Sequence, residues 1–140
     1  MTENKKENLN NRMIKFLFEG APVRGACVQM AEEWQEMIKF HHYPENVAAL
    51  LGQFTAGALL LSSTIKFEGS LILQVKGSGP IAFIYAEVRN PMSVRAMAEI
   101  REGAEIKPEM DLQELINKDG KGLCALILDP KDRRPGVQPY

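Results

Sequence analysis

Cysteine is scarce in this chain of 140 residues, which holds only Cys27 and Cys124. No CxxC, CxC or Cys/His spacing typical of a metal site occurs. Each cysteine lies in an apolar run, so we expect two buried thiols that pack as small hydrophobic side chains. A disulfide or a reactive pair is the alternative. A chain of this length can bury a single hydrophobic core without covalent cross-links.

An excess of basic charge is also missing. The chain has 17 Lys and Arg against 18 Asp and Glu, a formal net charge of −1. Nucleic-acid binding would call for a basic face, so we expect no such partner. The first twelve residues are polar and charged and do not contain the apolar segment of a secretory signal. We therefore expect a cytoplasmic protein.

Recognisable catalytic motifs are absent as well. No serine or cysteine lies in a GxSxG frame. Gly77–Pro80 precedes a strand pattern instead of a helix, so it is expected to be a hairpin turn and not a phosphate-binding loop. His41–His42, Glu32–Glu33 and Arg133–Arg134 are each typical of solvated surface. We predict that the protein is not an enzyme. A deep pocket lined by carboxylates or by the two histidines would favour an unrecognised enzyme instead.

The sequence does contain one long apolar run, which extends from Val47 to Ile65 without a formal charge. As a helix it would be about 28 Å long, close to the thickness of a bilayer core. However, it includes glycines, Gln53 and several hydroxyl residues, and it has no aromatic and basic anchors at both ends. These features favour a helix buried in a protein core, and we expect no membrane partner. Ala48, Gly52 and Ala56 recur every fourth residue, so one face of this helix should allow close approach.

The rest of the sequence predicts strands and short helices. Strands are expected at 13–18, 23–30, 70–76, 81–88, 94–101 and 123–128, and helices at 32–41, 45–63 and from Asp111 onward. Asp111 and Glu114 form a variant of the capping box. The strands at 70–76 and 81–88 should form a hairpin, and 94–101 should have one dry and one wet face. The strand at 123–128 is apolar on both faces, so we predict a central position for it.

Several stretches resemble the heat-shock protein 33 family of 33-kDa chaperonins. They are colinear with the family and lie at Phe16–Gly25 (FLFEGAPVRG), Tyr43–Pro44, Leu50–Gly52, Leu59–Gly69 (LLLSSTIKFEG), Leu71–Val75, Gly77–Pro80, Met92–Arg95 and Gly122–Pro130 (GLCALILDP). The trailing Arg134–Tyr140 (RPGVQPY) looks like the place where the family's chain continues. The resemblance extends from about residue 14 to residue 140.

The resemblance implies an α+β fold of two stacked β-sheets packed around a long buried central helix, with short peripheral helices. Residues 1–140 would be the N-terminal substrate-binding domain, without the C-terminal linker and zinc-binding domain. Family members are ATP-independent holdases that bind unfolding proteins under oxidative heat stress. Their switch is a zinc site of four cysteines in CxC and CxxC pairs. Cys27 and Cys124 match neither pair, so the resemblance implies no cofactor in these residues and zinc only in the full-length family.

A holdase must expose apolar surface to its clients. On the strand faces expected to point outward, we predict that the client-binding residues are Ile72, Phe83, Tyr85 and Met97. The alternative is that another element or a dimer partner covers them. A second functional hypothesis is a dimerisation or interaction module without holdase activity of its own, in which a homodimer forms by strand exchange.

Overall fold

The computed structural model describes residues 12–66, 68–89, 93–131 and 139. Its elements in chain order are β1 (Arg12–Leu17), β2 (Arg24–Gln29), α1 (Glu32–Lys39), α2 (Glu45–Thr64), β3 (Gly69–Lys76), β4 (Ile81–Arg89), β5 (Ser93–Ile100), α3 (Leu112–Ile116) and β6 (Leu123–Pro130). Every expected helix and strand is present, with ends that differ by a few residues at most. The predicted Arg133–Arg134 surface lies outside the described residues.

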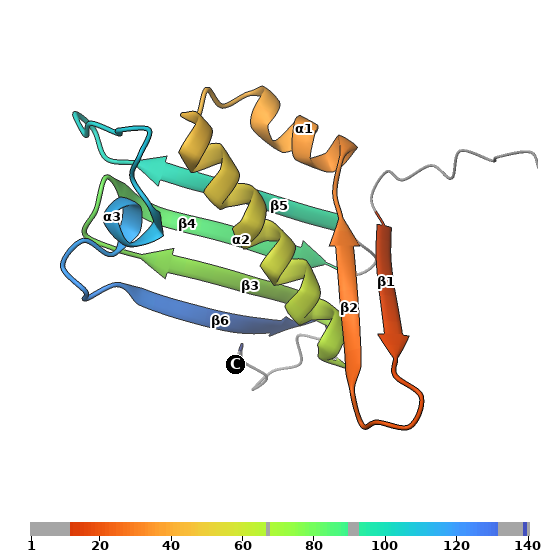
Figure 1. The fold of residues 1–140 in the computed structure, drawn as a ribbon. Coiled ribbons are helices and arrows are strands. Elements are labelled where there is room, and N and C mark those ends of the chain that lie inside the picture. The colour runs from red at the N-terminus through yellow and green to blue at the C-terminus, as the bar shows by residue number, and fades with distance from the viewer. Residues whose placement is uncertain (1–11, 67, 90–92, 132–138, 140) are drawn as a thin grey trace, which may run out of the picture.

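The described strands form two antiparallel sheets. One is the β1–β2 hairpin, and the other has four strands in the order β5-β4-β3-β6 (Figure 1). The three helices pack on the same face of the four-stranded sheet, where Trp34 of α1, Leu50 of α2 and Leu115 of α3 belong to one hydrophobic cluster. This arrangement confirms the α+β class, with two sheets, one long helix and short helices.

Helix α2 crosses the four-stranded sheet and buries one side of itself against it (Figure 1). Its buried residues are Val47, Leu50, Leu51, Thr55, Ala58 and Leu59. Met13 and Val28 of the β1–β2 hairpin pack against the cluster around Ala58. The C-terminal half of α2 therefore contacts both sheets. Its remaining side is less covered than the apolar sequence suggested, because Leu61 is 38% exposed.

The polar residues of α2 explain how so apolar a helix accommodates hydroxyl groups. The Thr55 hydroxyl donates to the Leu51 carbonyl at 2.6 Å, and Ser62 and Ser63 donate to carbonyls three residues earlier at 2.7 Å. Among the described helices, α2 is long and apolar enough to cross a membrane by length and composition alone. Its buried stripe against the sheet is the packing expected of a core helix.

The small-residue face of α2 receives an aromatic ring. A Cβ built at Gly52 would lie 3.3 Å from the Trp34 ring of α1, whereas a Cβ at Gly57 would meet nothing within 4 Å. The predicted close approach is therefore made at Gly52, and the neighbour is a side chain of α1 rather than another backbone.

The predicted central position of the last strand is wrong. β6 pairs only with β3 among the described strands and lies at the edge of the sheet. Leu123 is 67% exposed and Leu126 is 41% exposed. A strand with apolar residues on both faces need not have another strand at both of its edges. The order of strands in a sheet depends on pairing between distant segments, and the spacing of apolar residues within one strand does not report that pairing.

The predicted burial of the two cysteines is also wrong, since Cys27 and Cys124 are both exposed and free. Cys124 lies on the edge strand β6, and Cys27 lies on β2 of the two-stranded hairpin. Each segment is apolar in sequence, but Cys27 lies on a mostly exposed hairpin and Cys124 lies on an edge strand, beside a pocket that residues of α2 and α3 also line. A local apolar run therefore did not predict burial.

The junction between the β3–β4 turn and α3 is tightly packed. The capping box predicted at Asp111 is present, and Asp111 and Glu114 each accept a backbone N–H from the other residue at 3.0 Å. The carbonyls at the end of α3 approach the turn so closely that a Cβ at Gly77 would lie 1.4 Å from the Ile116 oxygen. The turn at Gly77–Pro80 is thus a hairpin turn, as predicted, and it also receives α3.

Candidate functional site

The four predicted client-binding residues lie on one face of the four-stranded sheet, the face turned away from α2, which we call the outer face. Tyr85 pairs directly with Met97 across β4 and β5, and Ile72 lies opposite Glu87 across β3 and β4. The Phe83 and Tyr85 rings stack with their centroids 6.1 Å apart. Side chains alternate along a strand, so all four point away from the helical layer. Met97 is 39% exposed, and the other three are half-buried.

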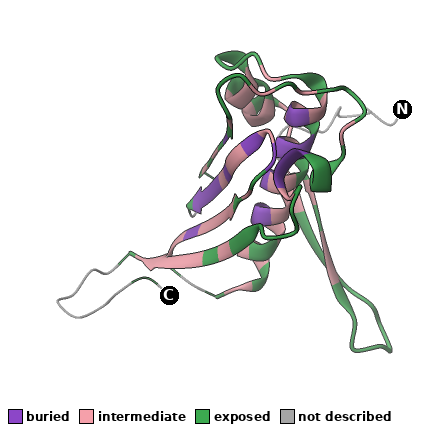
Figure 2. Ribbon diagram, turned by 90° about the vertical axis from the view of Figure 1, so that its left-hand side faces the viewer, coloured by how far each residue is buried: buried purple, intermediate pink, exposed green. Residues whose placement is uncertain are grey.

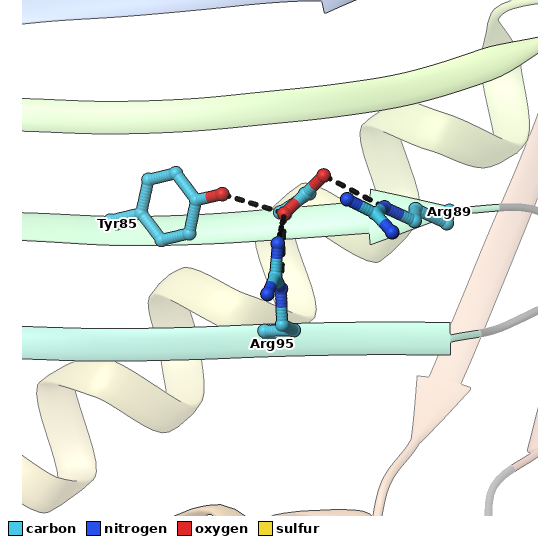
Figure 3. A network of polar contacts seen from close by, with 4 residues as sticks. Tyr85, Arg89 and Arg95 are labelled. Carbon is cyan, nitrogen blue, oxygen red and sulfur yellow. Dashed lines mark hydrogen bonds and ion pairs between the residues drawn. The ribbon is translucent and has the colours of Figure 1, made fainter. Parts of the chain in front are cut away.

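A charged cluster occupies the same face beside these apolar residues. The Glu87 carboxylate is only 4% exposed and accepts hydrogen bonds from Tyr85 at 2.7 Å, Arg89 at 2.9 Å and Arg95 at 2.6 Å. Figure 3 shows the tyrosine from β4 and the two arginines from β4 and β5 converging on this carboxylate. Both arginine side chains remain largely exposed. The cluster therefore places two exposed guanidinium groups on the outer face.

These contacts shift two pKa values in opposite directions. Burial of Glu87 disfavours its charged form, but the hydrogen bonds from Tyr85, Arg95 and Arg89 and the charge of Arg95 outweigh burial and lower its pKa to about 2. Burial, followed by the hydrogen bond to the Glu87 carboxylate, raises the pKa of Tyr85. At neutral pH the carboxylate is ionised and the phenol keeps its proton, so the phenol is a donor.

Glu87 should make folding stability depend on pH. Its pKa is about 2 when folded and about 4.5 as a free side chain, so its contribution is complete above about pH 4.5 and is lost as the pH falls toward 2. After allowance for solvent screening of the exposed arginines, we expect about 1–2 kcal/mol. Urea unfolding at about pH 6 and about pH 3 should show a larger loss for the wild type than for Glu87→Gln. Equal losses would contradict this assignment.

The possible metal ligands among the described residues are scattered. No group of three His, Cys, Asp or Glu side chains in the described ranges is arranged to hold a metal ion. His41 stacks on Tyr43 with ring centroids 5.2 Å apart, and His42 is exposed. The outer face instead combines apolar side chains with an ion cluster in which one carboxylate binds two arginines, and such a surface can bind apolar polypeptide.

A second apolar surface, which sequence reasoning missed, lies on the β1–β2 hairpin. The hairpin extends away from the body and is mostly exposed (Figure 2). Its large exposed side chains are Ile14, Phe16, Leu17, Phe18 and Val23. Leu17 is 80% exposed, more than any of the predicted residues. The available signal was that Lys15 is the only polar residue between Met13 and Phe18, which leaves both faces of a two-stranded sheet apolar.

Comparison with known proteins identifies the family. Residues 11–140 match the family model described as "Hsp33 protein". The chain belongs to the Hsp33 family. It is 39% identical over 134 residues to the "33 kDa chaperonin" of Neisseria gonorrhoeae (strain NCCP11945), a match that includes 94% of this chain and 44% of that protein. The resemblance seen in the sequence is therefore confirmed.

More distant Hsp33 relatives agree. The 33 kDa chaperonin of Aliivibrio salmonicida (strain LFI1238) is 38% identical over 88% of this chain and 40% of its own length. That of Shewanella woodyi (strain ATCC 51908 / MS32) is 35% identical over 91% of this chain and 41% of its own length. The chain thus spans less than half the length of these curated relatives.

Proposed function

We propose that this Hsp33 chain is an ATP-independent holdase domain that binds unfolding proteins and prevents their aggregation. The observation that carries the proposal is the outer face, where Ile72, Phe83, Tyr85 and Met97 lie together and no described helix covers them. The hairpin adds further exposed apolar surface. Patches of this kind on a folded domain mark sites of association with other proteins.

Holding requires no chemical energy. Removal of apolar surface from water contributes roughly 25 cal/mol per Å², so a client segment that covers several of these side chains binds without nucleotide hydrolysis. The ion cluster supports the same role, because Glu87 satisfies two arginines that would otherwise repel each other beside the apolar residues. The outer face is therefore apolar in part, and its charged cluster of one carboxylate and two guanidinium groups keeps one positive charge in excess.

The regulatory features of the family are part of the same proposal. We propose that residues 1–140 act as the N-terminal client-binding domain in the cytoplasm. Oxidative control would come from a zinc site outside these residues, because Cys27 and Cys124 match neither a CxC nor a CxxC pair. A linker like that of the longer relatives would cover part of the apolar surface until oxidation releases the linker. Addition of zinc should then leave this chain's stability unchanged.

Light scattering of a heat-denaturing enzyme tests the holdase proposal directly. In the absence of ATP, a few-fold molar excess of this chain should suppress the rise in scattering. Ile72→Thr combined with Met97→Gln removes apolar area from the outer face while keeping residues that strands tolerate. We expect this double variant to lose at least about half of the suppression of scattering, because a bound client would then bury less apolar area against the outer face.

The hairpin supplies the matched control. Leu17→Gln combined with Phe18→Gln changes two exposed apolar residues and leaves the outer face intact. If this pair loses suppression while the outer-face pair retains it, the hairpin is the client site. If wild-type protein does not suppress scattering at all, the holdase proposal is rejected.

The interaction-module hypothesis is favoured by one separate observation. Among the described strands, β6 has β3 as its one neighbour, and its Leu123 and Leu126 are exposed, so this side of the sheet can accept another strand. Such an edge does not require holdase activity, so association and holding are separable by measurement.

A further inference from the structure

The cluster around Glu87 holds one more cation than anion. Arg89 and Arg95 share the single carboxylate of Glu87, and Tyr85 donates to it as well (Figure 3). The Arg89 and Arg95 side chains are 59% and 66% exposed. Two solvent-facing guanidinium groups therefore lie beside the apolar residues of the outer face and share one counterion.

Glu87 receives only part of the hydrogen-bond donors of the two arginines. Arg89 donates to it through Nε, and Arg95 donates through Nε and Nη2. A guanidinium has five N–H donors in a planar fork, and a carboxylate is the side chain that accepts two of them at once. The chemistry of the cluster thus favours an acidic partner over an amide or a cation.

The other charged groups on the outer face leave this excess in place. Lys76 lies over the Phe83 ring, and Glu99 pairs with Phe83 across β4 and β5, so these two opposite charges flank one residue. Asp129, on β6, already has an interaction of its own. The glutamates of α1 that line a pocket with Arg95 belong to the helical layer: Glu32, Glu33 and Glu36. An acidic partner would therefore meet the two arginines from the outer face.

The apolar residues lie at a fixed spacing from Arg95. Met97 is two residues away on β5, and both side chains point to the outer face, where Tyr85 lies beside Met97. Alternate residues of a strand are about 7 Å apart. An extended segment laid along β5 has the same distance between its own alternate side chains. An apolar residue over Met97 therefore brings the side chain two positions away over Arg95.

We propose that the outer face selects client segments in which an acidic residue lies two positions from a large apolar residue. The apolar side chain packs on Tyr85 and Met97, and the carboxylate accepts hydrogen bonds from Arg95 and Arg89. An acidic residue directly next to the apolar one would point away from the sheet in an extended segment. The inference rests on the proposed holdase function, because it names the class of segment that the same face binds.

Fluorescence anisotropy with labelled peptides tests this selection. Three peptides share one apolar frame and carry Glu, Gln or Lys two positions from a leucine, and a fourth carries Glu next to that leucine. We expect the first peptide to bind the wild-type chain roughly fivefold more tightly than the Gln peptide. The Lys peptide should bind more weakly than the Gln peptide, and the peptide with adjacent Glu should bind like it. Added salt should reduce the preference for Glu.

Two substitutions on the outer face should change this preference in opposite directions. Arg95→Gln removes the excess charge and should make the affinities for the Glu and Gln peptides nearly equal. Glu87→Gln increases the excess and should enlarge the difference. The matched control is Arg24→Gln, which removes an exposed cation from β2 and should leave the difference unchanged. A variant that fails to fold would lose both peptides, whereas a change in selection alters their ratio.

The outcomes separate this inference from the holdase proposal. Equal affinities of the wild-type chain for the Glu and Gln peptides overturn the selection alone, since the Gln peptide still binds. A preference that survives Arg95→Gln but is lost in Arg24→Gln places the acidic contact on the hairpin and also overturns it. If the wild-type chain binds none of the peptides and does not suppress scattering, the holdase proposal is rejected, and the selection is rejected with it.

Discussion

Gly77→Ala should lower the free energy of unfolding by about 3 kcal/mol or prevent stable folding. The Cβ of alanine at this position would lie 1.4 Å from the carbonyl oxygen of Ile116, a distance that no real contact allows. The obstacle is backbone at the end of α3, so it cannot move aside as a flexible side chain would. Either α3 separates from the turn or the β3–β4 hairpin distorts.

The environment of the turn leaves little freedom to relax. The Arg101 guanidinium donates to the Gly79 carbonyl at 2.9 Å and also to the Gly77 carbonyl. The Ser78 hydroxyl accepts the Asp119 backbone N–H at 3.2 Å. Separation of α3 would also expose Leu115, which is 1% exposed in the native fold. The expected loss therefore combines steric strain with lost burial.

Chemical denaturation with far-UV circular dichroism measures this effect. Gly57→Ala is the matched control, because it adds the same methyl group where nothing lies within 4 Å and where a helix prefers alanine. We expect the control to be neutral or more stable by up to about 1 kcal/mol. A Gly77→Ala protein as stable as the wild type would show that α3 does not approach the turn as described.

Leu51→Ala should cost about 3–4 kcal/mol of folding stability. Leu51 lies on the buried face of α2, is 0% exposed, and packs in the cluster that also contains Ile84 of the sheet and Leu115 of α3. Truncation of the Leu51 side chain leaves a cavity between α2, the sheet and α3. Such a cavity collapses poorly, because each of its walls belongs to a separate element of secondary structure. A shift of the urea midpoint without a change in slope would report this loss.

Leu61→Ala provides the comparison on the same helix. Leu61 is 38% exposed, so its truncation removes little buried area and should cost less than about 1 kcal/mol. The contrast tests which side of α2 faces the sheet. Equal losses at positions 51 and 61 would indicate that the helix is enclosed on all sides, as its composition alone suggested.

Local patterns predicted most of the elements because local forces determine them. The capping box at Asp111 and Glu114 is a contact between residues three positions apart, and it is present as predicted. The alternation in β5 also appears as expected, with Ala98 buried and Arg95, Met97 and Glu99 exposed. The outward direction of Ile72, Phe83, Tyr85 and Met97 was found by the same reasoning, whereas their role in client binding stays a prediction.

The predictions that were wrong or incomplete concern burial and long-range contacts, which no short segment determines. Cys27 and Cys124 lie in apolar segments, yet both are exposed, since burial depends on where a strand lies in the tertiary structure. The charged cluster at Glu87 was also missed. Glu87 and Arg89 are two residues apart, but Arg95 reaches the same carboxylate only through the register of β4 and β5.

The sequence by itself determined the long apolar helix, the strands around it, and the faces on which the outward residues lie, because hydrophobic periodicity and turn chemistry act over a few residues. The family was indicated separately, by the resemblance of colinear stretches of sequence. Only the tertiary structure decided that β6 is an edge, that the hairpin exposes Phe16, Leu17 and Phe18, and that two arginines share Glu87. The physical reason is that strand order and surface exposure are set by contacts between distant segments, whose pairing no local pattern specifies.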